Sequence, residues 1–373
     1  YNMPKLKLII QVMSINLVIL SFQVVNKAIV TINIDFKTQA KASFSSVIIA
    51  GIIGIVMAYL GCGVWALVAQ FTTINIIQTF LLWYFEKWRP LRVFSKKSFK
   101  GLFNFGSKIL AANLLQTIYL NLYTLVIGKR FSATDLGYYS RADQFAQFPS
   151  SNITNILWRV TYPIMSSIQD EDEKLRNIYR QYIRLSAFII FPLMIGFAAV
   201  AEPFIIFILT EKWRGIIPIL QIISIFYMLY PLNAINQNLM QVKGRSDLFL
   251  RLEIVKKIIG IIILFISLPF GIYYVCLSLV IYALINLAIN TYFTSKLIRF
   301  NIPQQIKDLI RILFASLAMG AIVYLVNYIE INYILKLILG IIVGAITYTF
   351  IAWITKMSEL KQLINLIRPY IHK

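Results

Sequence analysis

One polar stripe contains the residues best suited to binding chemistry. It lies in the segment 136–170, LGYYSRADQFAQFPSSNITNILWRVTYPIMSSIQD, and its members recur at steps of three or four residues. They are Arg141, Gln144, Phe148, Asn152, Asn155 and Arg159. This spacing puts them on one face of a helix. Guanidinium groups suit phosphate oxygens, and amides exchange hydrogen bonds with sugar hydroxyls. The stripe predicts an anionic, hydroxyl-rich ligand, although the two arginines could also snorkel to lipid head groups.

Three other segments carry polar residues at helical spacing. One set is Asn113, Gln116, Thr117, Asn121 and Thr124; a second is Asn233, Asn236, Gln237 and Gln241, beyond Pro231; a third is Arg251, Lys256 and Lys257. We predict that Asn113, Gln116 and Lys256 join the stripe, with Lys256 attracting a phosphate or pyrophosphate. Two alternatives stay open, because polar residues also join helices together and lysines near a helix end snorkel.

Several classes of chemistry lack the residues they need. The single histidine, His372, is next to last, and Cys62 and Cys276 lie in or beside apolar segments. No GxxxxGK[ST] phosphate loop occurs. The only embedded acids expected are Glu253 and Glu202, which argues against a cation exporter or a glycosyltransferase. We therefore predict no enzyme, metal or cofactor.

The composition is that of a membrane protein. Of the 373 residues, 59% are hydrophobic, and the mean hydropathy is +0.75. This favours an all-α, polytopic helical bundle. The net charge of +21 fits basic cytoplasmic loops, and no soluble basic domain suggests nucleic-acid binding.

Apolar segments predict about eleven spanning helices. They cover 8–29, 40–61, 64–86, 102–128, 137–165, 178–200, 216–240, 249–268, 272–298, 309–328 and 333–355. The connection after the third is the most basic, so we place it in the cytoplasm, and alternation then puts the C-terminal tail inside as well. The acidic run 170–173 fits this topology least well, and lysine and arginines follow it.

An internal repeat divides the chain. Asp35 and the turn at Gly61 and Gly63 recur about 210 residues later as Asp247 and Gly271. We predict the remainder of an N-terminal lobe (1–86), a cytoplasmic connection (87–101), a C-terminal lobe (102–299), and an extra helix pair with an amphipathic tail (300–373). Two repeated lobes commonly enclose a substrate path. Leu360, Leu363, Ile364 and Ile367 give the tail one apolar face. A plain solvated tail is the alternative.

Several short motifs resemble those of Wzx-type polysaccharide flippases. They are NIDFK at 33–37, GVWALV at 63–68, KWRP at 87–90, FG at 105–106, IGK at 127–129, LGYYSRA at 136–142 and PIMSSIQD at 163–170. Their order and spacing are similar to the multidrug/oligosaccharidyl-lipid/polysaccharide exporter superfamily, nearest its colanic acid flippase branch.

The resemblance implies a two-lobed transporter of twelve or fourteen helices that works by alternating access in a bacterial inner membrane. Its substrate would be an undecaprenyl-pyrophosphate-linked oligosaccharide, moved from the cytoplasmic to the periplasmic leaflet. Implied partners are membrane lipids, a coupling ion and polysaccharide polymerase machinery. Three N-terminal helices of a fourteen-helix member are expected to be absent. An ion-coupled multidrug exporter and a membrane polymerase or ligase remain alternatives.

Overall fold

The computed structural model describes residues 4–32, 35–86, 88–90, 93–100, 103, 114, 117–118, 121–300 and 302–363. These residues form helices and turns with no strand among them, which confirms the predicted all-α class. Packing contacts divide the chain into unit 1, Tyr1–Leu115, and unit 2, Gln116–Lys373. The predicted division into four parts stays a prediction.

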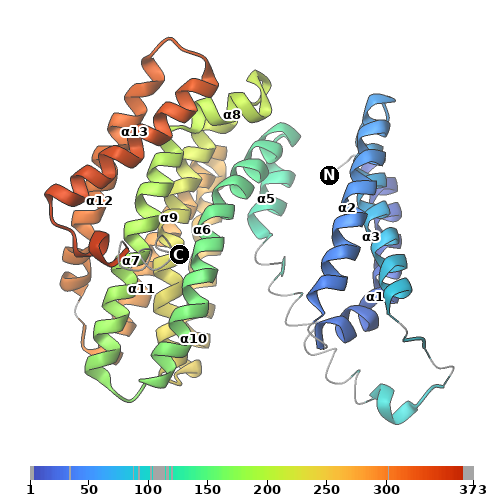
Figure 1. The fold of residues 1–373 in the computed structure, drawn as a ribbon, viewed down its shortest axis with the longest axis horizontal. Helices are drawn as coiled ribbons and strands as arrows, with labels where there is room; N and C mark the ends of the chain where they lie inside the picture. Colours follow the sequence, from blue (N-terminus) through green and yellow to red (C-terminus); the bar gives the residue numbers. More distant parts are fainter. Residues whose placement is uncertain are drawn as a thin grey trace, which may run out of the picture. The chain divides into compact units, whose positions relative to one another are not determined.

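Unit 1 contains three long helices, α1 (Pro4–Ile32), α2 (Phe36–Tyr59) and α3 (Val64–Phe85) (Figure 1). The α2–α3 turn requires glycine, since Gly61 and Gly63 have φ angles of +76° and +55°. Asp35 caps α2 by accepting a hydrogen bond from the Thr38 amide at 3.1 Å. Hydrogen bonds from the Thr38 side chain and amide hold the pKa of Asp35 below its usual value.

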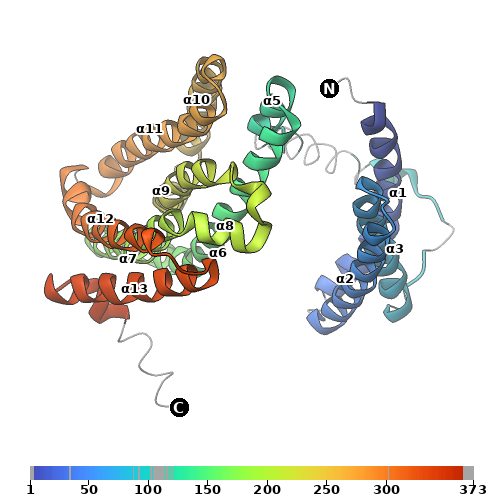
Figure 2. The same ribbon diagram turned by 90° about the horizontal axis from the view of Figure 1, so that it is seen from above.

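Unit 2 is a bundle organised around α9 (Figures 1 and 2). Its helices are α5 (Leu122–Arg130), α6 (Ala133–Ser167), α7 (Asp172–Ala199), α8 (Ala201–Leu209), α9 (Ile216–Val242), α10 (Ser246–Ser267), α11 (Ile272–Ile298), α12 (Ile302–Leu325) and α13 (Tyr333–Ile354). Helix α9 packs against α6, α7 and α11, while α12 packs against α7 and α13. Most of the apolar core therefore lies around α7 and α9.

Eight described helices are long and apolar enough to cross a membrane: α1, α2, α3, α7, α9, α11, α12 and α13. Helices α6 and α10 have 35 and 22 residues but are not among these eight; α6 is more polar, and α10 carries Arg251, Glu253, Lys256 and Lys257. Of the predicted span 102–128, only its last part, within α5, is described continuously. The connection between the predicted spans 178–200 and 216–240 contains the short helix α8 and a 3-10 turn, Glu211–Trp213.

Ion pairs join α7 to later parts of unit 2. The Arg180 guanidinium donates to the Asp308 carboxylate on α12 at 2.5 and 2.7 Å, and Arg184 pairs with the buried Glu359. Leu360 and Leu363 then pack against the core. The start of the tail is therefore attached to the bundle and is not simply solvated. Of the predicted apolar face, Ile364 and Ile367 lie outside the described residues.

The acidic run that fitted the topology least well is paired with basic side chains. Lys243 lies 2.6 Å from Asp172, and Lys174 lies 2.6 Å from Glu171. Glu173 lies 3.7 Å from Arg176. These pairs reduce the negative charge of the loop, so it is compatible with a cytoplasmic position.

Candidate functional site

An apolar groove of about 960 Å³ lies within unit 2. Helices α6, α7, α8, α12 and α13 supply its walls. The lining residues are Arg141, Gln144, Phe145, Phe148, Pro149, Ile189, Pro192, Leu193, Gly196, Phe197, Val200, Phe204, Met319, Val323, Leu337, Gly340, Ile341, Gly344, Ala345 and Tyr348. Arg141 supplies the only formal charge among these residues. We refer to this cavity as the unit 2 groove.

Glycines let the helices around the unit 2 groove approach closely. A Cβ atom on Gly340 would lie 2.8 Å from Val200 Cγ1, and one on Gly344 would lie 3.1 Å from Val323 Cγ2. Gly340 and Gly344 are one turn apart on α13, the spacing at which small residues bring membrane helices together. At Gly196, by contrast, an added Cβ would make an ordinary contact of 3.7 Å with Met319. The helix backbones therefore form part of the wall.

The N-terminal half of the predicted polar stripe lies at this groove. Arg141, Gln144 and Phe148 all line it. Arg141 Nη1 donates a hydrogen bond to Gln144 Oε1 at 2.8 Å, and Arg141 is exposed. A guanidinium held beside an apolar wall could bind a phosphate whose organic substituent lies in the groove.

Of the other stripe residues, the described side chains of Asn152 and Asn155 do not line the unit 2 groove. Asn152 and Asn155 are exposed, and Asn152 donates a hydrogen bond to the Phe148 carbonyl at 2.7 Å. The Arg159 side chain lies outside the described part of the structure, as do Asn113 and Gln116. Contact of these five residues with a substrate stays a prediction.

Lys256 lies inside unit 2, with 2% of its surface exposed. Its ammonium group forms an ion pair with Glu253 and donates a hydrogen bond to Asn290 Oδ1 at 3.1 Å. Asn290 donates to Asn233 Oδ1 at 2.9 Å, and Gln237 donates to Glu253 at 3.2 Å. This network joins α9, α10 and α11. The network holds the Lys256 ammonium group inside the bundle, which argues against the alternative that Lys256 snorkels to the lipid head groups. Binding of a substrate by Lys256 stays a prediction.

Asn236 belongs to a second buried polar layer. Its Oδ1 accepts hydrogen bonds from Tyr179 on α7 at 2.8 Å and from Thr294 on α11 at 2.6 Å. Its amide nitrogen donates to the Leu232 carbonyl at 2.8 Å. These bonds satisfy the side chain inside the bundle, so Asn236 joins helices, as the packing alternative for this amide row predicts.

Asp143 is an acid that the sequence reasoning missed. It lies on α6, two residues after Arg141, and accepts a hydrogen bond from the Tyr227 hydroxyl on α9 at 2.9 Å. No ion pair involves Asp143 among the residues described. The expectation that Glu202 and Glu253 are the only embedded acids was therefore wrong. Glu202 pairs with Arg214 outside the long helices, whereas Asp143 lies in the bundle.

The eight apolar helices define a multi-pass, all-α membrane protein. The lipid II flippase MurJ, in its inward closed conformation, has a similar fold, with a TM-score of 0.65. The alignment covers 87% of this chain and 67% of that chain, at 16% sequence identity. The model of the polysaccharide biosynthesis protein family matches residues 1–218. The chain belongs to this family.

Curated relatives are similar over much of the chain. Teichuronic acid biosynthesis protein TuaB of Bacillus subtilis is 26% identical over 326 residues, covering 85% of this chain and 67% of TuaB. Lipopolysaccharide biosynthesis protein WzxC of Escherichia coli is 26% identical over 257 residues, covering 68% of this chain and 52% of WzxC. Succinoglycan biosynthesis transport protein ExoT of Rhizobium meliloti is 23% identical, covering 51% of this chain and 39% of ExoT. The matches thus span between two fifths and two thirds of these relatives.

Proposed function

We propose that this chain takes part in moving a polyprenyl-pyrophosphate-linked oligosaccharide from the cytoplasmic to the periplasmic leaflet. The proposal rests on one observation: Arg141 is the charged residue in the lining of the apolar unit 2 groove. A polyprenyl tail requires an apolar path, while its pyrophosphate requires a cation beside that path. The names of WzxC and ExoT support a polysaccharide precursor as the cargo class.

Replacing Arg141 with Ala is expected to lower flipping of a fluorescent polyprenyl-pyrophosphate-linked sugar at least tenfold in proteoliposomes. The variant removes the charge at the groove and leaves its apolar wall intact. Combining it with Arg159→Ala should abolish export while membrane insertion is retained. Arg130→Ala, which removes an exposed arginine at the end of α5, is the matched control and should flip normally. Normal flipping by the Arg141→Ala protein would reject the proposed role of the groove.

We further propose that Asp143 binds the coupling cation, either a proton or an alkali metal ion. Its carboxylate has one hydroxyl donor, Tyr227, and no ion pair within the described residues. An acid inside a transporter bundle commonly belongs to an ion path. Asp143 does not line the unit 2 groove, but it lies on α6 with Arg141, so cation binding would change the charge of the helix that carries this arginine.

Asp143→Asn should therefore uncouple transport from an imposed ion gradient. The amide still accepts a hydrogen bond from Tyr227 but has no charge to exchange. We expect flipping by the variant to be the same with and without a proton or sodium gradient. The wild-type protein should flip several-fold faster with one of them. Equal gradient dependence in the two proteins would exclude Asp143 as the cation site.

A further inference from the structure

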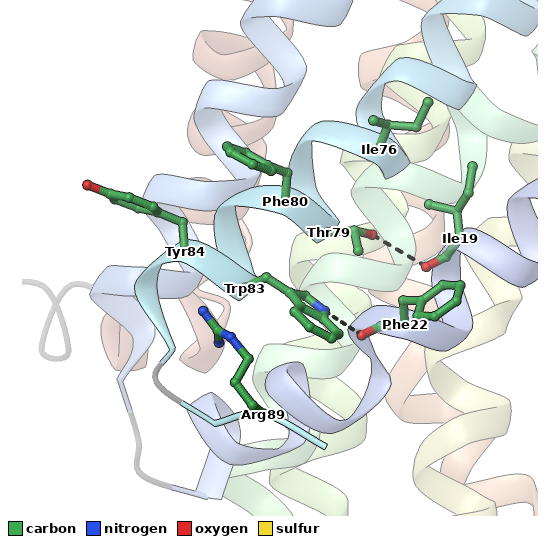
Figure 3. Close-up of a pocket in the computed structure, with 8 residues that line it drawn as sticks. All are labelled: Ile19, Phe22, Ile76, Thr79, Phe80, Trp83, Tyr84 and Arg89. Carbon is green, nitrogen blue, oxygen red and sulfur yellow. Dashed lines mark hydrogen bonds between the residues drawn. The ribbon is translucent and has the colours of Figure 1, made fainter. Parts of the chain in front are cut away.

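A second apolar groove lies within unit 1, between α1 and the C-terminal end of α3 (Figure 3). Its volume is about 570 Å³. The residues lining it are Ile19, Phe22, Ile76, Thr79, Phe80, Trp83, Tyr84 and Arg89. We refer to it as the unit 1 groove. As in the unit 2 groove, a single arginine supplies the only formal charge among the lining residues.

Hydrogen bonds satisfy two polar groups of the unit 1 groove. Trp83 Nε1 donates to the Phe22 carbonyl on α1 at 2.7 Å (Figure 3). Thr79 Oγ1 donates to the Asn75 carbonyl on its own helix at 2.7 Å and lies 3.5 Å from the Ile19 carbonyl. The aromatic side chains Phe22 and Phe80 remain 59% and 68% exposed. The surface left for a ligand is therefore largely apolar.

Arg89 is held at one end of this groove. Its Nη1 atom donates to the carbonyls of Glu86 at 2.7 Å and Trp88 at 2.8 Å. The guanidinium lies 5.4 Å from the centre of the Trp83 ring, within cation–π range (Figure 3). These contacts fix the group without using its Nε–Nη2 edge.

The Nε–Nη2 edge of Arg89 has the donors that a phosphate needs. In this same chain, Arg180 uses that edge to grip the Asp308 carboxylate at 2.5 and 2.7 Å. Among the described residues, the same edge of Arg89 takes part in no hydrogen bond or ion pair. Two parallel N–H donors suit two oxygens of one phosphate.

The position of the unit 1 groove identifies the kind of phosphate. Helix α3 ends at Phe85, where the predicted cytoplasmic connection begins, and Trp83 and Tyr84 are residue types enriched at membrane interfaces. The exposed Lys96, Lys97 and Lys100 add positive charge to this connection. Basic segments of this kind attract the anionic lipids of the cytoplasmic leaflet.

We propose that the unit 1 groove binds one anionic phospholipid of the inner leaflet. One acyl chain lies along Phe22, Ile76 and Phe80, and the phosphate accepts hydrogen bonds from Arg89 Nε and Nη2. A zwitterionic phospholipid offers the same chains and phosphate but adds a cation beside the guanidinium, which weakens its binding. This inference does not depend on the transport activity proposed above.

The test measures lipid retained by the purified full chain. The protein is incubated with equal amounts of phosphatidylglycerol and phosphatidylcholine, and bound lipid is counted by native mass spectrometry. We expect one retained phosphatidylglycerol per chain, and at least a fivefold loss in Arg89→Gln. Lys97→Gln is the matched control, because it removes the same charge from the same connection but lies outside the groove. It should retain the lipid.

A second variant keeps the charge and narrows the unit 1 groove. Ile76→Trp should also lose phosphatidylglycerol, and it serves as the test if Arg89→Gln fails to fold. If Arg89→Gln and Lys97→Gln lose equal amounts of phosphatidylglycerol, the basic connection attracts the lipid as a whole and the proposal is wrong. Equal retention of phosphatidylcholine would overturn it too. Displacement by equimolar polyprenyl pyrophosphate would assign the groove to the transport substrate instead.

Discussion

Lys256→Met is expected to lower the free energy of unfolding by about 3 kcal/mol, because it leaves the Glu253 carboxylate in the bundle without its cation. The ammonium group is almost fully buried and bridges Glu253 to Asn290. For a bundle of this size, the melting temperature should fall by roughly 6–12 °C. A thiol-reactive dye can follow unfolding, since Cys276 is fully buried in the folded protein.

Two further variants separate the ion pair from ordinary packing at Lys256. The double variant Glu253→Leu with Lys256→Met should recover most of the lost melting temperature, because apolar residues can replace a buried pair at little cost. Arg251→Met removes an exposed charge from the same helix and should melt like the wild-type protein. An unchanged melting temperature for Lys256→Met would contradict the buried pair.

Gly196→Leu is expected to reduce flipping at least tenfold without unfolding the protein. A Cβ at Gly196 would lie 3.7 Å from Met319, which is ordinary contact, so the backbone can accept a side chain there. The remaining leucine atoms would occupy the unit 2 groove, which Gly196 lines. Flipping in proteoliposomes and melting temperature should be measured on the same preparation.

Glycine controls distinguish a blocked groove from a disturbed helix contact. Gly51→Leu adds the same side chain to α2, where a Cβ would meet nothing within 4 Å, and should leave flipping unchanged. At Gly320, a Cβ would lie 2.4 Å from Ile195 Cγ2, so a leucine there should lower both the flipping rate and the melting temperature. If the Gly196→Leu protein flips the substrate at the wild-type rate, the polyprenyl tail of the substrate does not occupy the unit 2 groove.

The sequence by itself determined the class of the protein and most of its helices. Long apolar runs must form helices in lipid, because every backbone polar group has to be satisfied within its own segment. The predicted spans 64–86 and 272–298 therefore agree closely with α3 (Val64–Phe85) and α11 (Ile272–Ile298). Glycines also predicted the tight turns between helices, as at Gly271, which has a φ of +106°.

Only the tertiary structure decided which polar residues face one another. Helical spacing places Lys256 on a face of α10, but Asn290, 34 residues away in sequence, decides what that face meets. Asp143 lies inside the predicted span 137–165, so the sequence already showed an acid there; only its Tyr227 partner, 84 residues away, required the tertiary structure. The unit 2 groove likewise depends on packing between distant segments, because Gly196 of α7 and Gly340 and Gly344 of α13 all line it. A periodic pattern fixes the direction of a side chain around its own helix axis, whereas packing between distant segments fixes its partner.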